Sequence, residues 1–194
     1  MRVGQCASGV LDVYKCIFIL QNVIMESNGA TTGGALSIPG IFGVKILQSR
    51  LLRNRAEAMG GALSVQEINL LVIEDSLFDS NIAWGMMQVS ELGGALYISG
   101  ITGKFSRDIS IINTTFQNCS TGQLGGAIYL YYEGNITFTV KKSRFLDNLS
   151  FQSSGGTILL SLPPDIKKDP GCAPNSDNHV DEKYPSWVYK SCGF

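Results

Sequence analysis

The chain has 194 residues, and its 15 basic and 16 acidic side chains give a formal net charge of −1. This balance provides no basic face to neutralise phosphates and no polybasic segment for an anionic membrane, so it argues against nucleic-acid binding. A transmembrane helix needs roughly 18 consecutive apolar residues. The best candidate, residues 16–25, is interrupted by Gln21 and Asn22.

The chain contains 22 glycines. Several of them lie in pairs within a repeated tetrapeptide, Gly-Gly-Ala-(Leu/Ile). Successive copies lie 25 to 33 residues apart, a period typical of solenoids. A variant, Gly-Gly-Thr-Ile, and a weaker copy, Ser-Gly-Val-Leu, extend the series at its two ends. In chain order the copies are Ser8–Leu11, Gly33–Leu36, Gly60–Leu63, Gly93–Leu96, Gly125–Ile128 and Gly155–Ile158.

An alternating apolar pattern follows each glycine pair, as in Leu36 and Ile38 or Leu96 and Ile98. A period of two residues predicts a strand with one buried face, and no window has the period of an amphipathic helix. Strands without intervening helices cannot form βαβ crossovers, but they can coil so that equivalent strands of successive units stack in parallel. The predicted strands are 36–38, 44–46, 63–65, 69–73, 96–98, 108–112, 128–130, 136–140 and 158–160.

A second motif, an apolar residue followed three positions later by Asn or Cys, lies between the glycine pairs. We expect the glycines at sharp bends, where a Cβ would clash with the next rung or φ is positive. We expect the asparagines at turns, stacked as a ladder of hydrogen bonds. Residues that recur on every rung indicate a structural role. The pairs are Met25/Asn28, Leu51/Asn54, Phe78/Asn81, Phe116/Cys119 and Phe145/Asn148.

These patterns predict an all-β fold, a right-handed parallel β-helix of about six rungs in residues 1–162, with an irregular tail in residues 163–194 that is a cap or a linker. A Greek-key sandwich is the alternative, but it would not need identical glycines at each turn. Over Ser8 to Leu160 the two motifs resemble the repeats of polymorphic outer membrane proteins of chlamydiae and of predicted surface proteins of protists. The resemblance implies a pectin-lyase-like β-helix and, in the bacterial family, a surface-displayed adhesin. Met25, Leu51 and Cys119 depart from its Phe-x-x-Asn motif.

A carbohydrate-active enzyme, either a polysaccharide lyase or a glycoside hydrolase of the pectin-lyase-like fold, is the alternative function. Similar enzymes use clustered Asp residues, with a His or with bound calcium, but the single histidine here, His179, lies outside the repeats. Glycoside hydrolysis needs two carboxylates at a matched separation, and the cysteine and glycine spacings fit neither a zinc site nor a phosphate loop. We therefore expect no catalytic residue, metal or cofactor. The candidate carboxylates, of which two or more would have to converge in an enzyme, are Asp75, Asp79, Asp108 and Asp147.

Two features are candidates for ligand binding. Tyr97, Tyr129 and Tyr131 are expected on the outer face of neighbouring strands, where they could stack on sugar rings or simply pack against one another. The long insertion at residues 82–92, which contains Trp84, either folds back on the solenoid or offers a surface to a partner. A cell-surface or host protein, or a glycan, is the expected partner.

Asn-x-Ser/Thr sequons and cysteines bear on location. Four sequons within 36 residues favour a secretory-pathway protein if they are exposed, although Asn148 is also a ladder residue and could be buried. Cys172 and Cys192 could form a disulfide in the tail, and Cys6 and Cys16 a second one. The sequons are at Asn113, Asn118, Asn135 and Asn148.

The chain begins without a secretory signal pattern and its first repeat starts close to Met1. We therefore expect a fragment of a longer polypeptide. The favoured function is a non-enzymatic scaffold or adhesin-like domain, extracellular or at the cell surface. A fragment without independent function is a further possibility.

Overall fold

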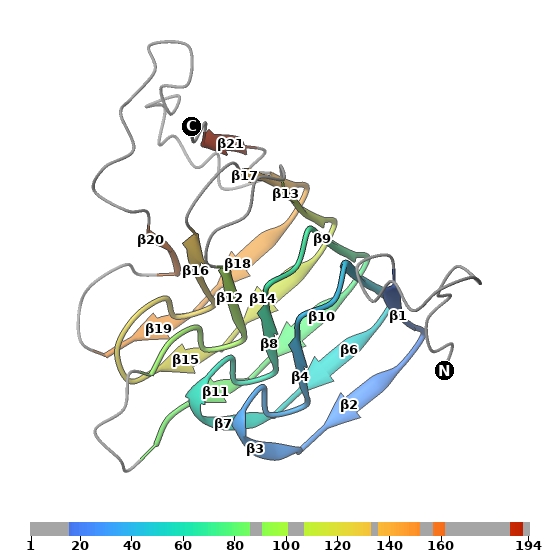
Figure 1. Cartoon of the computed structure of the whole chain (residues 1–194). Coiled ribbons are helices and arrows are strands. Elements are labelled where there is room, and N and C mark those ends of the chain that lie inside the picture. Colours follow the sequence, from blue (N-terminus) through green and yellow to red (C-terminus); the bar gives the residue numbers. More distant parts are fainter. Residues whose placement is uncertain are drawn as a thin grey trace.

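The computed structural model describes residues 16–85, 91–100, 107–132, 136–151, 157–161 and 187–191. This part of the chain contains no helix and coils into a β-solenoid of about four turns (Figure 1). Each turn, called a rung below, adds one strand to each of four sheets, A to D. The all-β fold of stacked parallel strands is therefore confirmed. Six rungs are not reached within the described residues, and the weak copy at Ser8–Leu11 lies outside them.

Sheets A and D are the two that the sequence predicts. Sheet A contains β1 (Ile17–Gln21), β5 (Gly43–Leu47), β9 (Leu70–Glu74), β13 (Arg107–Ile112), β17 (Ile136–Lys141) and β21 (Trp187–Ser191). Sheet D contains β4 (Leu36–Pro39), β8 (Leu63–Gln66), β12 (Leu96–Gly100), β16 (Ile128–Tyr132) and β20 (Ile158–Ser161).

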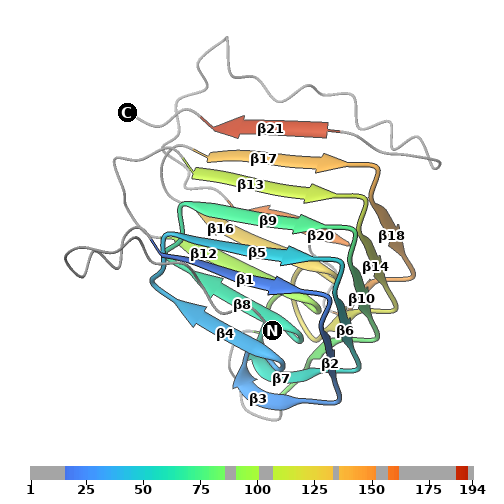
Figure 2. The same ribbon diagram turned by 90° about the vertical axis from the view of Figure 1, so that its right-hand side faces the viewer.

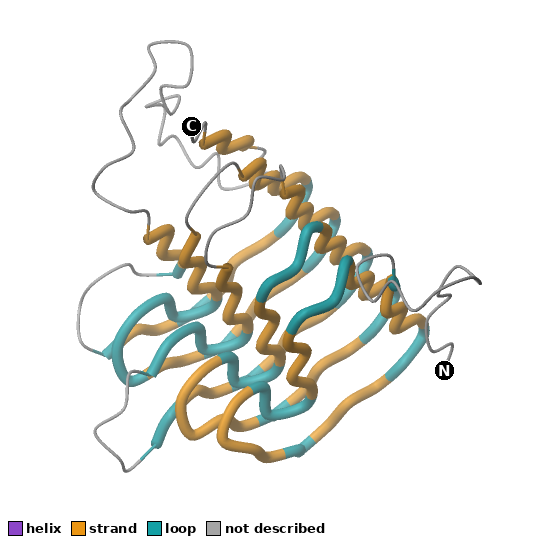
Figure 3. The backbone as a smooth tube through the Cα atoms, in the orientation of Figure 1, coloured by secondary structure: helices purple, strands orange, loops and turns teal. Residues whose placement is uncertain are grey.

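Sheets B and C consist of shorter strands that the alternating pattern does not predict. Sheet B contains β2 (Ile24–Glu26), β6 (Arg50–Leu52), β10 (Leu77–Asp79), β14 (Thr115–Gln117) and β18 (Arg144–Leu146). Sheet C contains β3 (Gly29–Thr32), β7 (Arg55–Met59), β11 (Ile82–Ala83), β15 (Ser120–Thr121) and β19 (Leu149–Ser150). All of these strands except β3 and β7 have only two or three residues, which is too short to show a period, and turns separate them along the tube in Figure 3.

Every neighbouring pair in the four sheets is parallel except the last pair of sheet A. There β21 runs antiparallel to β17, with Tyr189 opposite Phe138 (Figure 2). A strand at the edge of a sheet exposes unpaired backbone groups to other molecules. The strand contributed by the C-terminal tail covers this edge of sheet A.

At two corners of each rung the chain turns at a single residue, whose φ is positive and lies in the left-handed region. The first corner joins sheet A to sheet B, and the second corner joins sheet B to sheet C. Asn, Asp and small polar residues are favoured there because their side chains tolerate positive φ better than β-branched ones. The first-corner residues are Asn22, Gln48, Asp75, Asn113 and Lys142, and the second-corner residues are Ser27, Arg53, Ser80, Asn118 and Asp147.

The glycine pairs make the turn from sheet C to sheet D, and their two members are needed for different reasons. The first glycine has positive φ, as at Gly60 with φ +63°. The second lies against the next rung, because a Cβ on Gly61 would be 2.0 Å from the carbonyl oxygen of Gly94. Both reasons expected from the sequence are therefore confirmed, one for each position.

The inward side chains form one core along the axis. Ile46, Ile73 and Ile111 fill it from sheet A and are fully buried, as are Leu96 and Ile98 from sheet D. Burial of each such side chain contributes roughly 1.5–3 kcal/mol relative to exposure. Phenylalanines stack along sheet B, with centroids 4.6 Å apart for Phe78 and Phe116 and 5.2 Å apart for Phe116 and Phe145.

Candidate functional site: the corners and the outer face

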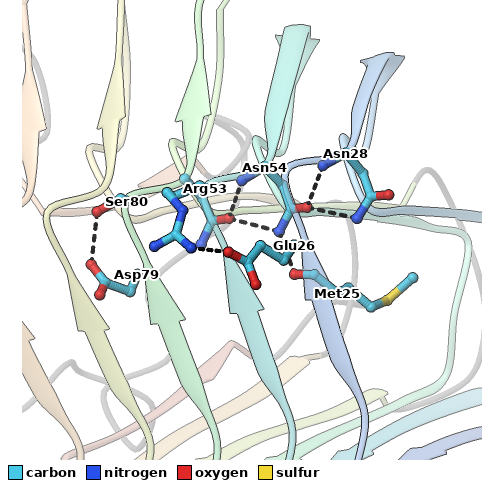
Figure 4. A network of polar contacts seen from close by, with 8 residues as sticks. Met25, Glu26, Asn28, Arg53, Asn54, Asp79 and Ser80 are labelled. Atoms are coloured by element: carbon cyan, nitrogen blue, oxygen red, sulfur yellow. Dashed lines mark hydrogen bonds and ion pairs between the residues drawn. The ribbon is translucent and has the colours of Figure 1, made fainter.

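The asparagine ladder predicted from the sequence is present at the second corner. The side-chain oxygen of Asn54 accepts hydrogen bonds from the backbone N–H and the amide nitrogen of Asn28, both at 3.0 Å. The side-chain oxygen of Asn81 accepts the corresponding two hydrogen bonds from the backbone N–H and the amide nitrogen of Asn54, both at 3.0 Å. Asn54 and Asn81 are fully buried, so the ladder satisfies groups that water cannot reach. Figure 4 shows the step from Asn28 to Asn54.

Cys119 interrupts this ladder. Its backbone N–H donates to the side-chain oxygen of Asn148 at 3.0 Å, but its thiol replaces the oxygen that an asparagine would offer to Asn81. Cys119 is free and fully buried. Burial raises the pKa of the Cys119 thiol to about 12, although hydrogen bonds with Asn81 oppose the shift. A thiol with so high a pKa is a poor nucleophile, which favours a packing role.

A second ladder, which the sequence analysis did not predict, runs along the first corner. Ser76 accepts a hydrogen bond from the backbone N–H of Ser49 at 3.1 Å, and its hydroxyl donates to the carbonyl of Glu74 at 2.8 Å. Thr114 and Ser143 continue the pattern on the next rungs. A hydroxyl two residues after β5, β9, β13 and β17 was the available signal, and it recurs at Ser49, Ser76, Thr114 and Ser143.

Outside the two ladders, exposed polar side chains contact their neighbours on adjacent rungs. Asn113 donates to Asp75 at 2.6 Å, and Asn118 donates to Asp79 at 3.2 Å. Arg53 forms an ion pair with Glu26, drawn in Figure 4. Exposed pairs of this kind contribute little to stability, about 0–1 kcal/mol.

The pKa of Asp79 is lower than its ordinary value. Partial burial would raise this pKa, but hydrogen bonds from Asn118, Ser80 and Gln117 and the charge of Arg53 outweigh it. Hydrogen bonds to a carboxylate favour its charged form. Asp79 is therefore an ionised acceptor at neutral pH, unlike a catalytic acid, which needs a raised pKa.

A shallow groove of about 390 Å³ lies along the first corner. Gln48, Arg50, Asp75 and Asn113 line it with exposed polar side chains, and Leu77 supplies apolar surface. One cation and one anion give the groove no net charge. Its four polar side chains can donate and accept hydrogen bonds.

The four candidate carboxylates lie on three parts of the surface. Asp75 is at the first corner, and Asp79 is four residues further on, at the opposite end of β10. Asp147 lies at the second corner, two rungs away from the end of β10 that carries Asp79, which is about 10 Å along the axis. Asp108 projects from the outer face of sheet A. The groove contains only Asp75 among the four.

The three tyrosines lie on β12 and β16. Tyr97 pairs with Tyr129 across the two strands, and their rings stack with centroids 5.7 Å apart. These two side chains are only 9% and 8% exposed and pack with Leu92 in a small second cluster, to which the half-buried Tyr131 is adjacent. Cross-strand packing therefore uses most of the ring surface of Tyr97 and Tyr129. Ligand binding by the three tyrosines stays a prediction.

Trp84 is more accessible, and it lies beside an aromatic residue that the sequence analysis missed. Its ring meets that of Phe151 edge to face, with centroids 4.9 Å apart. Gly122 occupies the intervening rung, and the Glu91 carboxylate fills the space that a Cβ there would take. Trp84 is 38% exposed and Phe151 55% exposed, and Leu149 beside them is 50% exposed. These three residues form an aromatic patch on the outer face of sheet C.

One buried cation also went unpredicted. Arg107 projects inward from the start of β13, and its guanidinium stacks on the ring of Tyr132 at 4.4 Å. Its Nη2 lies 3.6 Å from the carboxylate of Glu67. Burial lowers the pKa of Arg107, while the charge of Glu67 opposes the change. Gly100 leaves the necessary space, because a Cβ there would be 2.0 Å from Nη1.

Some of the sequon asparagines and cysteines lie within the described residues, and the others lie outside them. Asn113 and Asn118 are exposed, and Asn148 is half-buried in the ladder. Cys16 is disulfide-bonded, and its partner lies outside the described residues. Also outside them are Asn135, Cys6, Cys172, Cys192 and His179.

No three His, Cys, Asp or Glu side chains come together as a metal site within the described ranges. The same residues include no helix long and apolar enough to cross a membrane. The fold and its corners define a class of protein, a parallel β-solenoid whose rungs are joined by side-chain ladders. Comparison of the chain with protein-family models, with curated proteins and with solved structures finds no match.

Proposed function

We propose that this chain is a non-enzymatic scaffold or adhesin-like domain of a secreted or surface-displayed protein, and part of a longer polypeptide. In this proposal the coil is a right-handed parallel β-helix of the pectin-lyase type, because crossovers between parallel strands are nearly always right-handed. The observation that carries the proposal is the use of the periodic polar residues. Asn54, Asn81, Ser49 and Ser76 bond to neighbouring rungs and are buried, so they are committed to structure.

The aromatic patch is the proposed contact surface. Aromatic residues that remain exposed beside other apolar side chains are typical of binding hot spots. Trp84 and Phe151 are held by their edge-to-face contact, so little ordering would be needed on binding. The proposed partner is a cell-surface or host protein or a glycan.

Adhesion to cells and to an immobilised glycan panel tests this function, with the full chain as the probe. We expect Trp84→Ala to reduce binding at least tenfold. Ile24→Ala removes a side chain that is 60% exposed at the other end of the solenoid, and it should leave binding unchanged. Equal binding by the two variants would contradict the assignment of the patch. Release of sugar from a polysaccharide panel, abolished by Asp79→Asn, would contradict the non-enzymatic proposal.

A further inference from the structure

We propose that Asn113 and Asn118 carry N-linked glycans and that Asn148, despite its sequon, does not. This inference rests on the proposed extracellular location, because the modification belongs to the secretory pathway. All three asparagines precede Ser or Thr by two residues. The sequence alone cannot separate them, but their positions in the solenoid do.

Asn113 and Asn118 occupy the first and second corners of the same rung, at the two ends of β14. Both have positive φ, 46° and 53°, and both are exposed. Each amide nitrogen makes one hydrogen bond, to Asp75 and to Asp79 respectively. An amide nitrogen carries two hydrogens, so each can accept a sugar and keep that bond.

Asn148 differs from these two residues, because both the oxygen and the nitrogen of its side-chain amide form hydrogen bonds in the ladder. Its oxygen accepts the backbone N–H of Cys119 at 3.0 Å, and its nitrogen donates to the carbonyl of Phe116 at 2.9 Å. That nitrogen faces the preceding rung, beside the stacked rings of Phe116 and Phe145. Asn148 is half-buried between these groups, so a sugar on its nitrogen would crowd the residues that hold its amide, whereas Asn113 and Asn118 are exposed to solvent. A chain modified at Asn148 would therefore lose this step of the ladder.

The modification transfers an oligosaccharide from a polyprenyl diphosphate donor. A bond forms between the asparagine amide nitrogen and the anomeric carbon, while the bond from that carbon to the diphosphate oxygen breaks. The nitrogen loses one proton, and the lipid diphosphate leaves with the bonding electron pair. Nothing is oxidised or reduced, and the secretory pathway supplies both donor and transferase.

The test is site occupancy in the full chain, directed by a secretion signal into the secretory pathway of cultured eukaryotic cells. Asn135→Gln serves as background, so that only the three sites are counted. Enzymatic glycan removal in heavy-oxygen water followed by peptide mass spectrometry then reports each site. Secreted and cell-retained protein are both measured in the protease-resistant fraction, so that retention does not decide the result.

We expect two glycans in the background chain and the loss of one in each of Thr115→Ala and Ser120→Ala. Thr115→Ser keeps its sequon and should keep its glycan, and Ser150→Ala should change nothing. Empty Asn113 and Asn118, or an occupied Asn148 in protease-resistant protein, would overturn the inference. A chain with both glycans that binds no cell or glycan would contradict the adhesin function alone. A chain that binds without the glycans would contradict this inference alone.

Discussion

The amide nitrogen of Asn81 lies 4.0 Å from the sulfur of Cys119, whereas the amide nitrogen of Asn54 lies 3.0 Å from the side-chain oxygen of Asn81. A thiol is a weak acceptor, so the ladder is weakest at this step. All of these groups are fully buried, and water cannot replace the missing acceptor.

Cys119→Asn should stabilise the protein by about 1 kcal/mol, because the new oxygen would accept from Asn81 as Asn81 accepts from Asn54. Urea unfolding followed by circular dichroism measures the change in the free energy of unfolding. Cys119→Ala is the control that removes the sulfur without restoring the acceptor, and it should not stabilise. A less stable Cys119→Asn variant would show that this position is shaped for sulfur.

Stability should also fall at alkaline pH through this thiol. Its pKa is about 12 in the folded protein, raised from an ordinary value of 9.0. The stabilising contribution is thus complete below about pH 9 and is lost as the pH rises toward 12, because only the unfolded chain then releases the proton. The slope is about 1.4 kcal/mol per pH unit. Urea unfolding between pH 8 and pH 10.5 measures the free energy of unfolding of the original chain and of Cys119→Ala, and the variant should lack this loss of stability. Parallel pH profiles of the two proteins would contradict the prediction.

The first-corner ladder predicts a cost for Ser76→Ala. The change removes the acceptor of the buried Ser49 N–H, and a buried donor left without a partner costs about 1–3 kcal/mol. Ser37→Ala is the matched control, since Ser37 is exposed on β4. Thermal unfolding of the two variants should separate them clearly. Similar midpoints would indicate that the hydroxyl ladder adds nothing to stability.

Gly94→Ala should prevent folding or destabilise the protein by several kcal/mol. The new Cβ would lie 2.0 Å from the carbonyl oxygen of Gly126 and 2.7 Å from the backbone of Ser120, and neither can move without opening the rung. At Gly29 the nearest atom to a new Cβ is 3.9 Å away, so Gly29→Ala should be tolerated. The soluble yield and the midpoint of thermal unfolding of each variant measure these two effects. A normal midpoint for Gly94→Ala would mean that the rungs are further apart than the 2.0 Å contact with Gly126 implies.

Residues that repeat on every rung made most of this fold predictable. The glycine pairs and Phe-x-x-Asn motifs placed a turn, a core side chain and a ladder residue in each unit, and Asn54 and Asn81 lie as expected. Strands such as β11, with two residues, were not predictable because their order comes from stacking on β7 and β15. The hydroxyl ladder was overlooked because Ser and Thr are common in loops of any kind.

The outer surface was less predictable than the interior, because its contacts join residues far apart in the sequence. Trp84 and Phe151 meet across the rung that contains Gly122, which has no side chain. Tyr97 and Tyr129 were expected on the outer face, but their burial depends on packing with Leu92, which no periodic pattern shows. Arg107 lies at an inward position that ordinarily holds an apolar residue, and its contacts with Tyr132 and Glu67 are equally non-periodic.

A crystal structure of the full chain is the most direct test of the central claim, that parallel rungs are joined by side-chain ladders. The account predicts that Asn28, Asn54 and Asn81 stack in consecutive rungs, with the side-chain oxygens of Asn54 and Asn81 accepting from the backbone N–H of the preceding asparagine near 3.0 Å. It also predicts a right-handed coil. Antiparallel pairing among β5, β9 and β13, or asparagine side chains turned into solvent, would contradict it.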